Sequence, residues 1–145
     1  LMFRSGVDVI LGSHSHMVGP MEMRTVTTDD GTEKEVFLAY SLGNFLSSMT
    51  ADFTQDSVIL NLEFSKDSDG NTTISNANYV PVYIADNGED AEGRYVLLDA
   101  YAEIDKYVGG AADRVSDTIY NALKLDVDTL HQNAGAAFDR SNQAS

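Results

Sequence analysis

The chain has 145 residues, a length that fits one modest domain and is too short for two comfortable ones. Hydrophobic residues make up 43% and charged residues 22%, as in an ordinary globular protein and unlike a disordered one. With 23 acidic and 9 basic residues the formal net charge is −14, which argues against general binding to nucleic acid or to anionic lipid. The absence of cysteine excludes disulfides, thiolate zinc sites, iron–sulfur clusters and cysteine nucleophiles.

The first six residues are typical of the last turn of a helix, with Arg4 near its end and Gly6 suited to a left-handed stop. We therefore interpret the sequence as the C-terminal part of a larger protein. No apolar run approaches about 18 residues, so we expect no membrane span in this chain, and no signal peptide is visible.

Strand patterns dominate the first half of the chain. We predict strands at residues 7–11, 21–27 and 34–40, the last two joined by the turn Asp29-Asp30-Gly31-Thr32. Two further strands are predicted at 56–64 and 72–84. Pro81 indicates an edge or a bulge in the second of these. Alternation in 56–64 predicts one buried face made of Val58, Leu60, Leu62 and Phe64.

Residues 86–93 form an acidic, glycine-containing loop, after which the hydrophobic period becomes helical. One helix is predicted to bury Leu97, Tyr101, Ile104 and Val108 and to end at the glycines 109 and 110. A second helix is predicted at 112–123, the pattern beyond Leu125 is weak, and 139–145 is expected to be a disordered tail. Strands followed by helices predict an α/β (α+β) fold, as part of a layered sandwich.

The segment Gly12-Ser13-His14-Ser15-His16 directly follows the predicted buried strand 7–11. Functional groups of α/β sheets collect at the carboxyl ends of strands, and imidazole is a common ligand for divalent metals. His14 and His16 are therefore candidate metal ligands. The spacing alone is explained at least as well if His14 and His16 are ordinary loop residues that bind no metal. The third histidine, His131, is expected at the surface.

A second unusual segment is Tyr40-Ser41-Leu42-Gly43-Asn44-Phe45, also at a strand end. Asn44 can donate to a bound oxyanion or orient a ligand, although a structural turn explains Gly43 and Asn44 equally well. Glu22 can accept a hydrogen bond from a metal-bound histidine, or lie on the surface as an ordinary strand residue. Gly12, Ser13, Glu22 and Asn44 are the candidates for contacts to the histidines or to substrate.

Together the two segments resemble a known family. They resemble the C-terminal half of the CapA, or poly-γ-glutamate capsule synthesis, family. The resemblance rests on residues 5–16, which end in Gly-Ser-His-Ser-His, on Pro20 and Glu22, and on residues 39–45, Ala-Tyr-Ser-Leu-Gly-Asn-Phe. That family is similar to the calcineurin-like metallophosphoesterases. The motifs cover roughly residues 5–64. Ser15 stands where the family usually has proline, and Gly19 stands where glutamine is common.

The resemblance implies a four-layer α/β/β/α sandwich with two divalent ions, Mn, Zn or Fe, at the strand ends. His14 would ligate one ion and His16 the other. Paired cations in such centres hold a bridging hydroxide and clamp the oxygens of a phosphoester. Residues 1–85 would be the C-terminal half of this domain, and 86–138 an acidic loop and helical extension.

The upstream Asp-x-His, Gly-Asp and Gly-Asn-His motifs of the family are absent from these residues. Two imidazoles cannot hold two divalent ions, which need carboxylates as well. We therefore predict that this chain alone binds metal weakly or not at all and hydrolyses nothing. Its partner would be the missing N-terminal half of the same domain, without which an apolar sheet face is expected to be exposed.

Two functions follow from the resemblance. The first is a metal-dependent hydrolase acting on a phosphoester or on a bond in an anionic cell-surface polymer. The second is a non-catalytic binding or scaffold role in the assembly or export of such a polymer. Either would place the protein outside the cell or at the cell surface, behind a membrane anchor in the longer protein.

Overall fold

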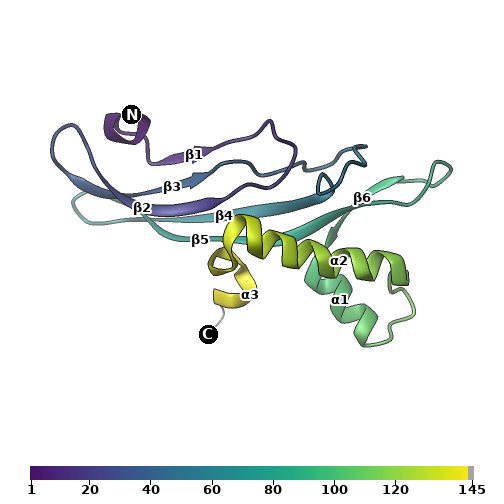
Figure 1. Cartoon of the computed structure of the whole chain (residues 1–145). Coiled ribbons are helices and arrows are strands. Elements are labelled where there is room, and N and C mark those ends of the chain that lie inside the picture. The colour runs from purple at the N-terminus through teal and green to yellow at the C-terminus, as the bar shows by residue number, and fades with distance from the viewer. Residues whose placement is uncertain (144–145) are drawn as a thin grey trace.

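The computed structural model describes residues 1–143 and shows a mixed α+β fold. Two three-stranded sheets come first, and the helices gather at the C-terminal end (Figure 1). This order confirms the predicted mixture of strands in the first half and helices after them. The switch from a two-residue to a helical period in the sequence is what separates the two parts.

The first sheet has the strand order β1 (Val9–Leu11), β3 (Glu33–Ala39), β2 (Met21–Thr27). β1 runs parallel to β3 and β2 antiparallel to it, which confirms the predicted hairpin. Gly31 turns that hairpin with φ of 89°. Before β1, the 3-10 turn η1 (Met2–Ser5) ends at Gly6, whose φ of 105° fits the predicted helix end. Because β1 pairs only with β3, it is an edge strand.

The second sheet is antiparallel, with the order β4 (Asp56–Lys66), β5 (Thr72–Asp86), β6 (Tyr95–Asp99). Pro81 precedes Val82, the first residue of β5 that pairs with β6, so it lies where β5 has an open edge on that side. The register instead shifts between Glu63 and Phe64. Phe64 pairs with the buried Ile74 on the same face as Val58, but it is 55% exposed, against the prediction that it is buried, because the last four residues of β4 lie at the exposed end of the strand.

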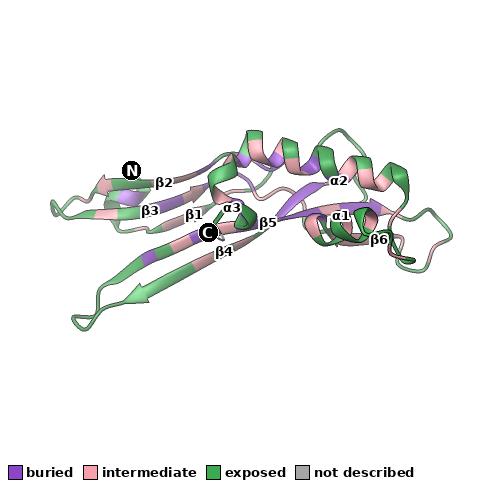
Figure 2. Ribbon diagram, turned by 90° about the horizontal axis from the view of Figure 1, so that it is seen from below, coloured by how far each residue is buried: buried purple, intermediate pink, exposed green. Residues whose placement is uncertain are grey.

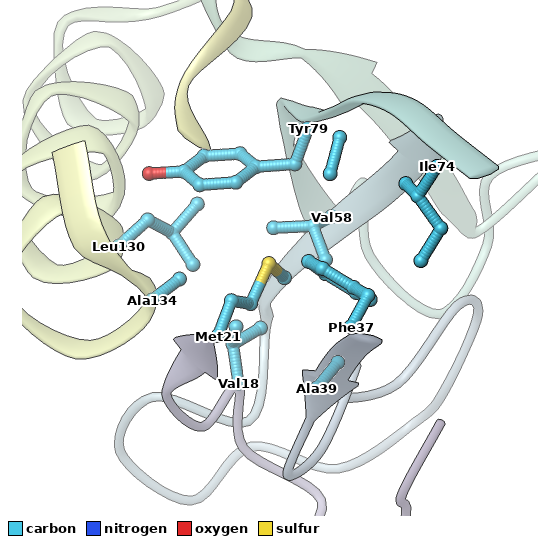
Figure 3. Packing of buried hydrophobic residues seen from close by; sticks show 10 residues of the cluster. Val18, Met21, Phe37, Ala39, Val58, Ile74, Tyr79, Leu130 and Ala134 are labelled. Carbon is cyan, nitrogen blue, oxygen red and sulfur yellow. The ribbon is translucent and has the colours of Figure 1, made fainter. Parts of the chain in front are cut away.

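One hydrophobic core joins the two sheets to the end of the second helix. Figure 3 shows side chains from β2, β3, β4 and β5 meeting beside Leu130 and Ala134. Burial is concentrated there, whereas the far end of the β4–β5 hairpin is exposed (Figure 2). The buried members of this core are Val18, Met21, Phe37, Ala39, Val58, Ile74, Ala77, Tyr79, Leu130 and Ala134.

The helices begin later than predicted. Residues 95–99 form β6, and α1 (Ala100–Val108) starts only after Asp99, whose carboxylate accepts from the Ala102 N–H. The second helix, α2 (Asp117–Leu130), is capped by Ser116 instead of starting at 112, and it continues past the predicted end to Leu130. None of the helices in the described part of the chain is long and apolar enough to cross a membrane.

The C-terminal segment differs from the expected tail. The π-helical turn η2 (His131–Gly135), the 3-10 turn η3 (Ala136–Phe138) and the short helix α3 (Arg140–Gln143) follow α2 without a break. Asp139 is fully buried, and the Phe138 ring packs edge-on against Phe37 of β3 with 5.8 Å between centroids. Of the expected tail, residues 144–145 lie outside the described residues.

Candidate functional site

The histidine loop, residues 12–20, leaves β1 at its carboxyl end and leads into β2. Its first residue is fixed to the neighbouring strand, because the Gly12 N–H donates to the Ala39 carbonyl over 2.7 Å. A Cβ at Gly12 would overlap the Tyr40 carbonyl oxygen. Only glycine lets the two backbones come this close, and this explains why the motif has glycine at position 12.

The second motif, residues 40–45, lies directly against this loop. The Tyr40 N–H donates to the Pro20 carbonyl, and the Gly19 N–H donates to the Ser41 carbonyl, each over 3.0 Å. Gly43 has φ of 74° and forms an isolated bridge with Ser57, so this segment also contacts the start of β4. The structure therefore brings the two sequence motifs together at one end of the first sheet, beyond the carboxyl ends of β1 and β3.

A side-chain hydrogen bond joins the two motifs. His16 Nδ1 lies 2.8 Å from Asn44 Oδ1. The Asn44 Nδ2 group donates to the Thr54 carbonyl over 3.0 Å and lies 3.8 Å from the Met49 sulfur. Thr54 is 4% exposed, so Asn44 links an exposed histidine to a buried part of the chain.

Both histidines adopt a left-handed backbone, with φ of 96° at His14 and 60° at His16. Such residues are uncommon outside glycine, and they cluster at functional sites, where the surrounding structure holds them in place. Both side chains are exposed, as is Ser13 between Gly12 and His14. The loop therefore presents its imidazoles to solvent.

Two acidic side chains near the loop, Glu22 and Asp8, each contact a basic residue. Glu22 lies in β2, and its carboxylate is 3.5 Å from the Arg24 guanidinium, two residues along the same face of the strand. In the part of the chain that the structure describes, no hydrogen bond links Glu22 to either loop histidine. Asp8, just before β1, forms an ion pair with Lys34 of β3 over 2.6 Å.

The described residues do not complete a metal centre. Within residues 1–143, no group of three or more histidine, aspartate or glutamate side chains is arranged to hold a metal ion. Two neutral imidazoles without a carboxylate are a partial ligand set for the divalent ions that the resemblance implies.

Apolar side chains surround the two motifs at the surface. Phe45, the residue after Asn44, is 66% exposed, and Leu11 at the end of β1 is 51% exposed. Exposed apolar side chains are characteristic of interfaces and binding sites where they gather into a patch. The large exposed hydrophobic residues in residues 11–53 are Leu11, Met17, Tyr40, Phe45, Leu46, Met49 and Phe53.

Two buried polar clusters were not predicted. In the first, Asp126 of α2 is fully buried and Asp56 of β4 is 8% exposed. Burial, followed by the nearby negative charge of Asp56, raises the pKa of Asp126 to about 9. Burial also raises the pKa of Asp56. The Asp126 carboxyl group is therefore protonated near neutral pH, and among the described residues neither of its oxygens has a hydrogen-bond partner. Neither residue's sequence context indicates this pair of acids.

The second cluster centres on Asp139, and it corrects the prediction that His131 is a free surface residue. The Asp139 carboxylate lies 2.7 Å from His131 Nε2 and accepts hydrogen bonds from the Tyr101 hydroxyl and from the Ser141 N–H and hydroxyl. Burial raises the pKa of Asp139, but the hydrogen bonds outweigh it and lower that pKa below its usual value. The cluster ties the C-terminal segment to α1 and to the end of α2.

No curated protein and no solved structure matches the chain. One family model does match, over part of the chain that includes both motifs and both loop histidines. Residues 1–49 are similar to the family described as bacterial capsule synthesis protein PGA_cap.

Proposed function

We propose that residues 1–49 carry the histidine part of a dimetal, metallophosphoesterase-like hydrolase site in a protein of bacterial capsule or poly-γ-glutamate synthesis. The observation that carries the proposal is the family match over these residues, which contain His14, His16 and Asn44. Their placement supports it, since both motifs lie together at a strand end with one histidine anchored through Asn44.

The chain's own contribution is to hold and present two imidazoles. Gly12 allows the loop to pass close to Tyr40, and the left-handed backbone at His14 and His16 turns the loop there. Mn, Zn or Fe ions, held also by carboxylates, would supply the activated hydroxide of a phosphoester hydrolase. Within the described residues, the histidines are not part of any group of three or more potential ligands that could hold such an ion.

The remaining ligands would come from a partner that continues the first sheet. β1 is an apolar edge strand with Leu11 half exposed, and apolar edges are usually paired or covered. The N-terminal half of the same domain is the proposed partner, and the four-layer sandwich is the proposed form of the completed domain. Its substrate would be a phosphoester or an anionic polymer, at the cell surface or outside the cell.

A second candidate is a non-catalytic role in binding or in scaffolding the assembly or export of a cell-surface polymer. The observation that favours it is the partial ligand set of the described residues. A site that keeps the loop but lacks the carboxylates can still bind through the exposed apolar side chains around Phe45.

The test is hydrolysis of a chromogenic phosphoester by the complete natural protein in which this sequence occurs, with added Mn²⁺ or Zn²⁺. His14→Ala and His16→Ala are each expected to lower the metal-dependent rate by roughly tenfold or more. Glu63→Gln, an exposed change on β4, serves as the matched control and is expected to leave the rate unchanged. Equal rates in wild type and in both histidine variants would contradict the hydrolase.

The prediction for the isolated chain is tested separately by titrating it calorimetrically with Mn²⁺ or Zn²⁺. Weak or undetectable binding is expected because two imidazoles fill too few coordination positions. Tight binding that disappears in His14→Ala would show that the chain carries a complete site, and it would overturn the need for a partner.

A further inference from the structure

Asn44 is placed between two groups of fixed hydrogen-bonding character. Its Nδ2 atom is 3.0 Å from the Thr54 carbonyl oxygen, and its Oδ1 atom is 2.8 Å from His16 Nδ1. A backbone carbonyl can only accept, so the side of Asn44 that faces Thr54 must be its NH₂ group. The side that faces His16 is then the amide oxygen, which also can only accept.

This chain of hydrogen bonds determines which ring nitrogen of His16 carries a proton. Since Oδ1 accepts, Nδ1 of His16 must donate, and in the neutral imidazole the other nitrogen then has a free lone pair. We infer that Asn44 is a positioning residue that holds neutral His16 as the Nδ1–H tautomer and leaves Nε2 as the nitrogen that can bind a ligand. The tautomer is a property of this chain alone, whereas its use for a metal ion rests on the proposed function.

Thr54, which accepts the hydrogen bond from Asn44, is itself fixed in position. Thr54 is 4% exposed, and its hydroxyl donates to the Ala51 carbonyl over 2.6 Å, which closes the turn that leads into β4. On the other side, Gly43 bridges to Ser57 within β4 itself. Asn44 is therefore held through its side chain by Thr54 and through the neighbouring backbone by the bridge of Gly43 to Ser57. Its side-chain amide in turn orients the His16 ring.

The three histidines of the chain have three different environments, which makes the inference directly measurable. His131 Nε2 lies 2.7 Å from the Asp139 carboxylate, so this residue carries its proton on Nε2. For His14, no hydrogen bond is found to any residue in the described range 1–143. His131 and His14 therefore serve as internal references, one for the opposite tautomer and one for an unrestrained ring.

The experiment is a long-range ¹H–¹⁵N correlation spectrum of the metal-free, ¹⁵N-labelled chain at about pH 8.5, well above the ordinary imidazole pKa. The ring signals are assigned with the single variants His14→Gln and His16→Gln. For His16 we expect a protonated-type Nδ1 and a lone-pair-type Nε2, the reverse of the pattern at His131. Asn44→Ala should shift His16 toward the Nε2–H form that predominates for histidine in water, with His131 unchanged.

Asn44→Asp is the conservative control. Its carboxylate still accepts from Nδ1, so the His16 pattern should return even though the donation to Thr54 is lost. An Nε2–H pattern for wild-type His16, or the same pattern in wild type and Asn44→Ala with the His131 signals intact, would overturn the inference. If the Nδ1–H form is found but no metal-dependent activity appears in the complete protein, the inference stands and the hydrolase proposal fails.

Discussion

Gly12 is the residue whose role the structure explains most completely. The Tyr40 carbonyl passes so close to its Cα that no Cβ fits, and the Gly12 N–H is already bonded to Ala39. Gly12→Ala must push the histidine loop away from the second motif. We expect the free energy of unfolding to fall by about 1–3 kcal/mol, as for other overpacked sites, measured by urea denaturation.

The control is Gly31→Ala, where a Cβ meets nothing within 4 Å and only the positive φ of 89° opposes the change. Its cost should be about 1 kcal/mol, and it should leave the His16 ring signals unchanged. Gly12→Ala should move those signals. A Gly12→Ala protein with wild-type stability and unaltered His16 signals would contradict the close-approach argument.

At the residue scale, the sequence indicated which side chains to consider but not how they meet. The two motifs identified His14, His16 and Asn44 by resemblance and by their position after strands. The hydrogen bond between His16 and Asn44 joins positions 28 residues apart, so it depends on the packing of two loops. Glu22 was a reasonable histidine partner by type, but Arg24 on the same strand face takes its carboxylate.

At the element scale, α2 buries an acidic side chain, Asp126, near Asp56 of β4, which makes the stability of the fold depend on pH. Asp126 keeps its proton in the folded state up to about pH 9, whereas an unfolded aspartate loses it near about pH 4. The folded state therefore binds more protons over this range, and stability must fall as pH rises. One such group contributes up to about 1.4 kcal/mol per pH unit.

Asp126→Asn removes this titration and keeps the size of the side chain. We expect the variant to gain stability over wild type progressively between about pH 5 and pH 8, in urea unfolding curves recorded at each pH. Asp128→Asn, an exposed change on the same helix, is the matched control and should follow the wild-type curve. Parallel curves for Asp126→Asn and wild type would show that Asp126 is ionised in the folded state.

Elements with strong local signals were predicted well. β2 has the predicted bounds because an Asp-Gly turn and alternating residues both specify it. β6 was missed because Leu97 fits a helical period with Tyr101, whereas the pairing of Leu97 with Ile84 makes it a strand. α2 was predicted too early and too short because its buried Asp126 interrupts the apolar pattern that marks a helix face.

At the scale of the whole molecule, one buried carboxylate links the C-terminal segment to both α1 and the end of α2. Asp139 accepts from Tyr101 of α1 and from Ser141, and it contacts His131 at the end of α2. Asp139→Ala leaves these groups without their partner, and we expect a loss of about 3 kcal/mol at neutral pH by thermal or urea unfolding. Arg140→Ala, an exposed neighbour, should cost little.

The sign of the pH dependence at this site is opposite to that at Asp126. The folded-state pKa of Asp139 is lowered, so its contribution is present above the unfolded pKa of about 4 and is lost as the pH falls through the folded value. The difference between wild type and Asp139→Ala should therefore shrink under acidic conditions. A difference that persists unchanged at low pH would mean that the lost packing, and not the carboxylate, causes the destabilisation.

The attachment of β1 has a consequence for how the histidine loop fluctuates. β1 pairs over three residues with one neighbour and has a free edge, so few hydrogen bonds must break for it to separate from β3. Segments of this kind open locally without global unfolding. Because Gly12 follows β1 at once, such an opening frees the histidine loop too. Anything that binds only the closed form, whether an added strand or an ion, stabilises it by mass action, so order at the loop and occupancy of the site are linked.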